Sequence, residues 1–73
     1  SPLAPDELRC LSCRAGRRPV DMSVVAYLNT PQTTRLQGVC VRCGGRTSRI
    51  ISNAKRHDFA QTFQIKSNAN SDA

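Results

Sequence analysis

The sequence predicts a small zinc-stabilised β protein, a zinc ribbon with two zinc knuckles and a three-stranded antiparallel sheet. The four cysteines form two C-x-x-C pairs, Cys10/Cys13 and Cys40/Cys43, separated by 26 residues. This spacing is slightly longer than that of the usual four-cysteine zinc site but of the same kind. The chain has 73 residues, with one tyrosine, two phenylalanines and no tryptophan. A core this small needs additional stabilisation, which a structural metal can supply.

Four thiolates fill the tetrahedral coordination shell that Zn²⁺ prefers, so we expect one structural zinc ion with no open position for water. The alternative is a pair of disulfides or a redox motif. Bridges within each C-x-x-C pair would close very small loops and constrain the unfolded chain little. A redox motif of the thioredoxin type needs a βαβ surround, which the sequence does not indicate. No apolar segment precedes Cys10, so we expect a cytoplasmic protein and not a secreted scaffold.

The first half of the chain predicts a lead-in, a knuckle and a strand. Residues 1–8 contain two prolines and two acids and predict a disordered lead-in to a zinc-ribbon domain over residues 9–52. Gly16 can supply positive φ after the first knuckle. Residues 20–28 are rich in β-branched and aromatic side chains and predict the best strand of the chain. Pro31 and its polar neighbours then predict a hairpin turn or a longer loop.

The second half predicts two further strands around the second knuckle. Residues 34–41 form the expected return strand, in which Gly38 marks a bulge or a close approach of two backbones. Gly44 follows the second knuckle and is expected to take the left-handed conformation. Residues 46–52 alternate polar and apolar side chains and predict the third strand.

The segment after the ribbon has no dominant periodicity. Residues 53–66 predict a short helix or an edge strand, because Phe59 and Phe63 are four positions apart and Phe63 and Ile65 are two apart. A disordered tail is the third alternative for this segment. Residues 67–73 predict a disordered tail. These three apolar residues favour one of two roles, either covering the thin core of the ribbon or anchoring a peptide that folds on a protein partner.

The charge of the chain predicts a polyanionic partner. Its formal net charge is +6, and a zinc ion with four thiolates would reduce this to about +4. Arginine guanidinium groups pair with phosphates, so we expect nucleic-acid binding dominated by phosphate contacts. A solvated basic surface without a partner is the alternative. The basic residues expected to contact DNA or RNA are Arg14, Arg17, Arg18, Arg42, Arg46, Arg49, Lys55 and Arg56.

Other function classes lack a supporting pattern in the sequence. No constellation supplies an acid, a base and a nucleophile, so we expect no enzyme activity and no small-molecule substrate. No apolar run is long enough to span a membrane. His57 lies in a solvated KRHD segment, and we expect no metal-binding role for it. We expect a monomer whose partner is nucleic acid or, alternatively, a larger protein machine such as RNA polymerase.

The segment from Cys10 to Ile50 resembles a family of single zinc-ribbon domains of unknown function, seen in phage and archaeal proteins. The likeness rests on the first C-x-x-C pair, on Val20-Asp21-Met22, and on the segment QGVCVRCGGRTSRI. This last segment contains a G-x-C-x-x-C-G pattern followed by Arg49 and Ile50. The chain departs from the family's Asn-Gly turn, having Asn29-Thr30-Pro31 there. The resemblance implies the zinc-ribbon fold and the zinc ion, and it implies no particular activity. We expect a small regulatory factor that is encoded by a phage.

Overall fold

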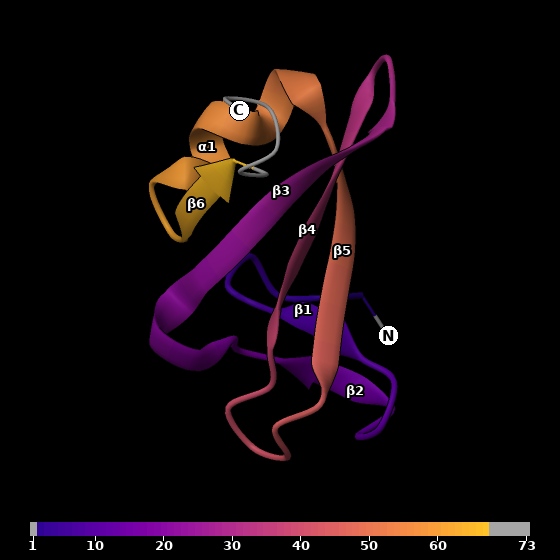
Figure 1. Ribbon diagram of the computed structural model, residues 1–73, viewed down its shortest axis with the longest axis vertical. Coiled ribbons are helices and arrows are strands. Elements are labelled where there is room, and N and C mark those ends of the chain that lie inside the picture. The colour runs from indigo at the N-terminus through magenta and orange to yellow at the C-terminus, as the bar shows by residue number, and fades with distance from the viewer. Residues whose placement is uncertain (1, 68–73) are drawn as a thin grey trace.

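Six strands form one sheet in the order β2-β1-β5-β4-β3-β6 (Figure 1). The computed structural model describes residues 2–67. Three short helical segments accompany the sheet, and α1 lies beside β6 at the C-terminal end (Figure 1). The bounds of the elements are β1 Leu8–Cys10, β2 Ala15–Arg17, η1 Val20–Met22, β3 Ser23–Thr30, β4 Thr33–Val39, β5 Arg46–Ser52, η2 Asn53–Lys55, α1 Arg56–Ala60 and β6 Gln64–Ser67.

The prediction of a three-stranded sheet was wrong, because the sheet has six strands. The three predicted strands correspond to β3, β4 and β5, and the third has the predicted bounds. The additional strands β1, β2 and β6 are three, three and four residues long. Segments this short carry almost no periodic signal, so their pairing with distant strands is not visible in the local sequence.

Strand β3 begins three residues later than predicted. Asp21 and Met22 have positive φ values of 58° and 53°, which take the backbone out of the extended conformation. The Met22 N–H donates to the Pro19 carbonyl at 3.0 Å, closing the turn η1. Aspartate tolerates the left-handed region better than most residues, whereas nothing in the structure explains the choice of methionine.

The connection between β3 and β4 is a tight turn and not a longer loop. Thr30 pairs with Thr33, which leaves Pro31 and Gln32 as the turn, and a bulge lies between Leu28 and Thr30. The proline ring fixes φ near the value that the first central position of such a turn requires. The hydroxyl groups of Thr30 and Thr33 lie 2.6 Å apart.

Gly38 allows β4 to lie very close to the segment from Pro19 to Ser23, and the sequence indicated such a close approach of two backbones. A Cβ atom at this position would lie 2.8 Å from the Cβ of Pro19 and 3.0 Å from the Ser23 carbonyl oxygen. Real Cβ atoms do not approach other atoms so closely, so any larger residue would push Pro19 away from β4.

The N-terminal segment differs from the expected disordered lead-in. The Arg49 Nη1 donates to the carbonyl oxygens of Ala4 at 2.8 Å and Glu7 at 3.1 Å. Leu8 is fully buried and begins β1. Residues 4–8 are therefore fixed by contacts with β5, which is distant in sequence.

The C-terminal segment contains both the short helix and the edge strand that the sequence predicted as alternatives. Residues 53–60 are helical, and β6 pairs with β3 in parallel orientation. Of the expected disordered tail over residues 67–73, Ser67 ends β6, and residues 68–73 lie outside the described part of the chain. No helix within residues 2–67 is long and apolar enough to cross a membrane.

The hydrophobic core lies on one face of the sheet, between the sheet and α1. The rings of Phe59 and Phe63 are stacked with centroids 6.2 Å apart, and the Arg49 guanidinium lies 4.8 Å from the Phe59 centroid. Met22, Phe59 and Ile65 pack against the buried cluster. Its members are Leu8, Val24, Ala26, Leu36, Ile51 and Phe63.

Replacing Phe63 with alanine tests whether the C-terminal segment belongs to the fold. Phe63 is 2% exposed, so Phe63→Ala should lower the free energy of unfolding of the metal-loaded protein by about 3–5 kcal/mol. Leu28 is 83% exposed, and the control Leu28→Ala should change it by less than about 0.5 kcal/mol. Denaturant unfolding followed by circular dichroism measures both. Equal stability of the two variants would contradict the assignment of Phe63 to the core.

Candidate metal centre

The four cysteines meet at one end of the sheet because two turns are brought together there. Cys10 ends β1, and the register pairs it with Thr47 of β5. Cys40 follows β4 and forms an isolated bridge with Pro19. The turn after β1 and the turn between β4 and β5 therefore lie side by side at the lower end of the sheet in Figure 1.

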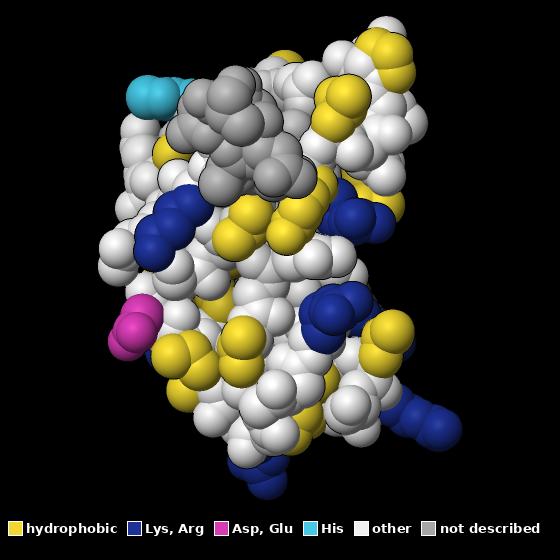
Figure 2. Space-filling model, viewed as in Figure 1, with side chains coloured by type: hydrophobic (Ala, Val, Ile, Leu, Met, Phe, Trp, Pro, Cys, Tyr) yellow, Lys and Arg dark blue, Asp and Glu magenta, His cyan; other side chains and the backbone are white. Residues whose placement is uncertain are grey.

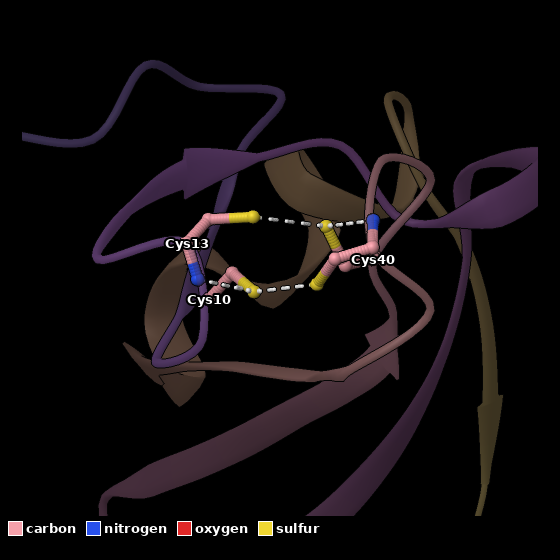
Figure 3. Close-up of side chains that lie close together, drawn as sticks. Cys10, Cys13 and Cys40 are labelled. Carbon is pink, nitrogen blue, oxygen red and sulfur yellow. Dashed lines mark hydrogen bonds between the residues drawn. The ribbon is translucent and has the colours of Figure 1, made fainter.

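The sulfur atoms of Cys10, Cys13, Cys40 and Cys43 all lie within 4.8 Å of one another. The Cys10 and Cys43 sulfurs are 3.5 Å apart, and those of Cys13 and Cys40 are 3.9 Å apart. Figure 3 shows the Cys13 and Cys40 side chains pointing toward each other from the two turns. A Zn–S distance of about 2.3 Å places the sulfurs of a tetrahedral site about 3.8 Å apart. The four side chains are thus close enough to hold one metal ion, and their spacing fits zinc.

The disulfide alternative does not describe this arrangement. All four cysteines are free thiols, and the two closest sulfur pairs join the two turns. A disulfide requires about 2.05 Å between sulfurs. The arrangement brings all four sulfurs toward one point, which suits a shared ligand better than two separate bridges.

Backbone N–H groups point at the sulfurs in both turns. The Cys13 N–H donates to the Cys10 sulfur at 3.4 Å. The N–H groups of Arg42 and Cys43 donate to the Cys40 sulfur, each at 3.4 Å, and the Gly45 N–H donates to Cys43 at 3.3 Å. Such donors stabilise negative sulfur and therefore favour the thiolates that a metal requires.

The surroundings shift the pKa values of Cys40 and Cys43 in opposite directions. Burial raises the pKa of Cys40, but the N–H groups of Cys43 and Arg42 lower it, and the result is a pKa of about 6. The Gly45 N–H lowers the pKa of Cys43, but the side chains of Cys10 and Cys13 and burial raise it to about 12. Crowded sulfurs share protons because each negative charge opposes the next. A divalent cation removes this repulsion and allows all four to ionise.

Arg17 supplies positive charge beside the cluster. Contact with the Cys13 side chain raises the pKa of its guanidinium, burial lowers it by less, and the charges of Cys13, Cys40 and Cys10 add to the increase. Its Nε is buried and has no hydrogen-bond partner among the described residues. Four thiolates around Zn²⁺ have a net charge of −2, which Arg17 would partly neutralise. From the sequence we assigned Arg17 only to nucleic acid, because its position beside the sulfurs depends on the pairing of the short strand β2 with β1, which no local pattern predicts.

Equivalent positions in the two turns have the same unusual backbone conformation. The residue after Cys13 is Arg14, with φ 56°, and the residue after Cys43 is Gly44, with φ 75°. The positive φ of Gly44 confirms the prediction for the second turn. In the first turn the left-handed residue is Arg14, and Gly16 instead lies in β2. A Cβ at Gly16 would collide with the Glu7 carboxylate.

The basic residues selected from the sequence differ in exposure. Arg14, Arg18, Arg42, Arg46 and Lys55 are exposed, although Arg18 forms an ion pair with Asp6 at 2.9 Å. The remaining three, Arg17, Arg49 and Arg56, are half-buried. The Arg49 guanidinium donates hydrogen bonds to carbonyl oxygens of the N-terminal segment, so it is less available to a phosphate than the exposed arginines are.

The three apolar residues of the C-terminal segment pack inward. Phe63 belongs to the core, and Phe59 and Ile65 pack against it. The structure therefore favours the role of these residues in covering the core over their role as anchors for a partner.

Comparison of the chain with protein-family profiles, with curated proteins and with solved structures finds no match. The class of protein is accordingly defined by the fold and the site alone: a small β-rich protein with a four-cysteine cluster that fits one metal ion. Membership of the zinc-ribbon family and a phage origin stay predictions.

Removing the metal should unfold the protein. Because the metal site forms only on folding, the binding free energy of the metal contributes to folding. We expect a chelator to abolish the dispersed amide spectrum of the zinc-loaded protein, and Cys40→Ser to prevent folding even with added zinc. Leu11→Ser alters an exposed side chain in the first turn and should leave the spectrum dispersed. A folded Cys40→Ser variant would contradict a structural role for the metal.

Exchanging the left-handed residues tests the geometry of the turns. No atom lies within 4 Å of a Cβ placed on Gly44, so Gly44→Ala adds only backbone strain and should destabilise the metal-loaded protein by about 1 kcal/mol. Arg14→Gly removes the same strain from the first turn and should stabilise it by a similar amount. Thermal unfolding in excess zinc measures both changes. Shifts of the same sign in the two variants would refute the assigned conformations.

Proposed function

We propose that this chain is a zinc-ribbon accessory protein that binds nucleic acid and acts as a small regulatory factor. The four sulfurs support the zinc assignment because soft thiolates in a compact group are typical ligands of Zn²⁺. Four protein ligands leave no coordination position for water, so the ion stabilises the fold and takes no part in a reaction.

The single observation that carries the proposal is the amount of basic charge left in contact with solvent. Of eleven Lys and Arg residues, eight are exposed, and the described residues contain one ion pair, Arg18 with Asp6. Exposed guanidinium and ammonium groups on a small domain attract polyanions and release the counterions of phosphates. The exposed residues are Arg9, Arg14, Arg18, Arg35, Arg42, Arg46, Lys55 and Lys66.

Phosphate contacts are the main source of affinity in this proposal. Within residues 2–67 the one α-helix is five residues long and packs its Phe59 ring toward the core, so it is too short to read bases from a major groove. Arg14 and Arg42 project from the two metal-binding turns, where their exposed side chains can reach a phosphate backbone. DNA and RNA are both acceptable ligands for such contacts.

A protein-interaction adaptor, docking on a larger machine such as RNA polymerase, is the second candidate. One observation favours it: Leu11 and Val41, at the tips of the two turns, are 76% and 62% exposed. Apolar side chains at adjacent tips can enter a pocket of a partner. Phe63, which the sequence offered as an anchor, is in the core and gives this candidate no support.

Binding to nucleic acid should depend steeply on salt. If about four phosphates of a single strand are neutralised, the logarithm of the association constant should fall against the logarithm of salt concentration with a slope near −3. Fluorescence anisotropy of labelled oligonucleotides of mixed sequence, titrated with zinc-loaded protein from low to physiological salt, measures the slope. The metal-free protein is the control. Absence of binding at low salt, or an association constant that does not change with salt concentration, would refute the proposal.

A further inference from the structure

The sheet has a second face that the core does not cover. Side chains alternate along each strand, so Val24, Leu36 and Ile51 point into the core and their neighbours point away from it. The register places Tyr27 of β3, Arg35 of β4 and Ile50 of β5 side by side in one row on the uncovered side. We call the surface that carries this row the open face.

The open face carries basic residues at three further positions, which lie in two rows of the sheet. The register places Arg9 opposite Ser48, Lys66 opposite Val25 and Arg46 opposite Val39, all on the side of Arg35. Five neighbouring strands, from β1 to β6, span about 19 Å. In the view of Figure 2, Lys and Arg side chains lie beside hydrophobic ones over the region of β3, β4 and β5. The acidic side chains that are visible in this view lie at the edge of the molecule.

Three of the four acidic residues of the described chain lie away from the open face, and Glu7 lies at its margin, where its carboxylate occupies the space that a Cβ on Gly16, the cross-strand partner of Arg9, would need. Asp6 forms its ion pair with Arg18, and Glu7 accepts a hydrogen bond from the Ala4 N–H. Asp21 is in η1, and Asp58 is in α1. The charges of Arg35, Arg46 and Lys66 are therefore not neutralised by acidic side chains of their own strands.

The centre of the open face contains stacking groups. The Arg35 guanidinium carbon lies 5.5 Å from the centroid of the half-buried Tyr27 ring. Val39 and Ile50 are 52% and 58% exposed. A hollow of ≈ 420 Å³ runs from Tyr27 along β4 to Arg46. Planar bases stack on aromatic rings, on guanidinium planes and on apolar side chains, so this surface offers contacts to bases as well as to phosphates.

We propose that the open face binds single-stranded nucleic acid, with a base stacked on the layered pair of Tyr27 and Arg35. Arg9, Arg46 and Lys66 contact the phosphates on either side of it. The inference rests on the proposed function and adds the location of the site and the class of ligand. Bases in a duplex are stacked on one another and are not accessible to a sheet face, so Tyr27 and Ile50 favour an unpaired strand.

The test compares four ligands of about 12 nucleotides in length. Three share one base sequence: single-stranded DNA, single-stranded RNA and duplex DNA. The fourth is a strand with the same number of phosphates but no bases. Anisotropy at constant salt measures the affinity of the zinc-loaded protein for each. We expect at least one natural single strand to bind about tenfold more tightly than the baseless strand and the duplex, because each stacked base adds a contact that phosphates cannot supply.

Variants of Tyr27 locate the stacking contact. Tyr27→Leu should lower the affinity for the natural strand about tenfold, to a value near that for the baseless strand. Tyr27→Phe keeps the ring and should bind as the unaltered protein does. Should Tyr27→Leu fail to fold, the tyrosine fluorescence of the unaltered protein locates the contact instead. Tyr27 is the one tyrosine and there is no tryptophan, so this fluorescence comes from Tyr27 alone. The natural strand should quench its fluorescence, and the baseless strand should not.

The outcomes separate the inference from the proposed function. Equal affinity for natural and baseless strands, tighter binding to duplex, or tyrosine fluorescence that does not respond to a bound natural strand would overturn the open-face site while leaving a phosphate-binding protein. Absence of binding to all four ligands at low salt would overturn both. An unchanged affinity of folded Tyr27→Leu would place the strand on another surface.

Discussion

The contact among the four cysteine sulfurs is the constraint on which the arrangement of this chain depends. It joins the turn after β1 to the turn between β4 and β5, two segments separated by residues 14–39. Strand β1 is only three residues long, so its pairing with β5 gains little from backbone hydrogen bonds alone. A metal ion at this position would hold β1 in the register in which Leu8 and Cys10 are completely buried.

The four-cysteine cluster and the aromatic pair of Phe59 and Phe63 lie at opposite ends of the same sheet (Figure 1). The buried apolar cluster has six members, which is a small core for a protein of this length. Phe63, beyond β5, covers part of the sheet that is distant from the four cysteines. One face of the sheet is covered by Arg49, α1 and the N-terminal segment, and within residues 2–67 the core leaves the opposite face uncovered.

The sequence predicts those parts of the fold that depend on local patterns. The C-x-x-C pairs predict the metal ligands, the alternation of residues 46–52 predicts β5, and Gly44 predicts the second turn. It does not predict β1, β2 and β6, because each is formed by pairing with a distant strand. Register has the same limitation: whether an arginine faces the core, as Arg49 does, or the solvent, as Arg35 does, depends on a pairing that no local pattern contains.

The assignment of the basic residues differs between sequence and structure, because it too depends on strand pairing that no local pattern contains. The sequence places the arginines near the cysteines in one group, whereas the fold gives them separate roles. Arg17 lies against the sulfurs, Arg49 holds the N-terminal segment, and Arg46 faces the solvent beside Val39. Arg9 and Lys66, far apart in sequence, come onto one surface only when the six strands assemble.

X-ray absorption spectroscopy of the purified protein at the zinc edge tests the central claim most directly. The account predicts one zinc ion per chain, surrounded by four sulfur atoms at about 2.3 Å and by no lighter ligand. Nitrogen or oxygen in the first coordination shell, or a folded protein without bound metal, would contradict it.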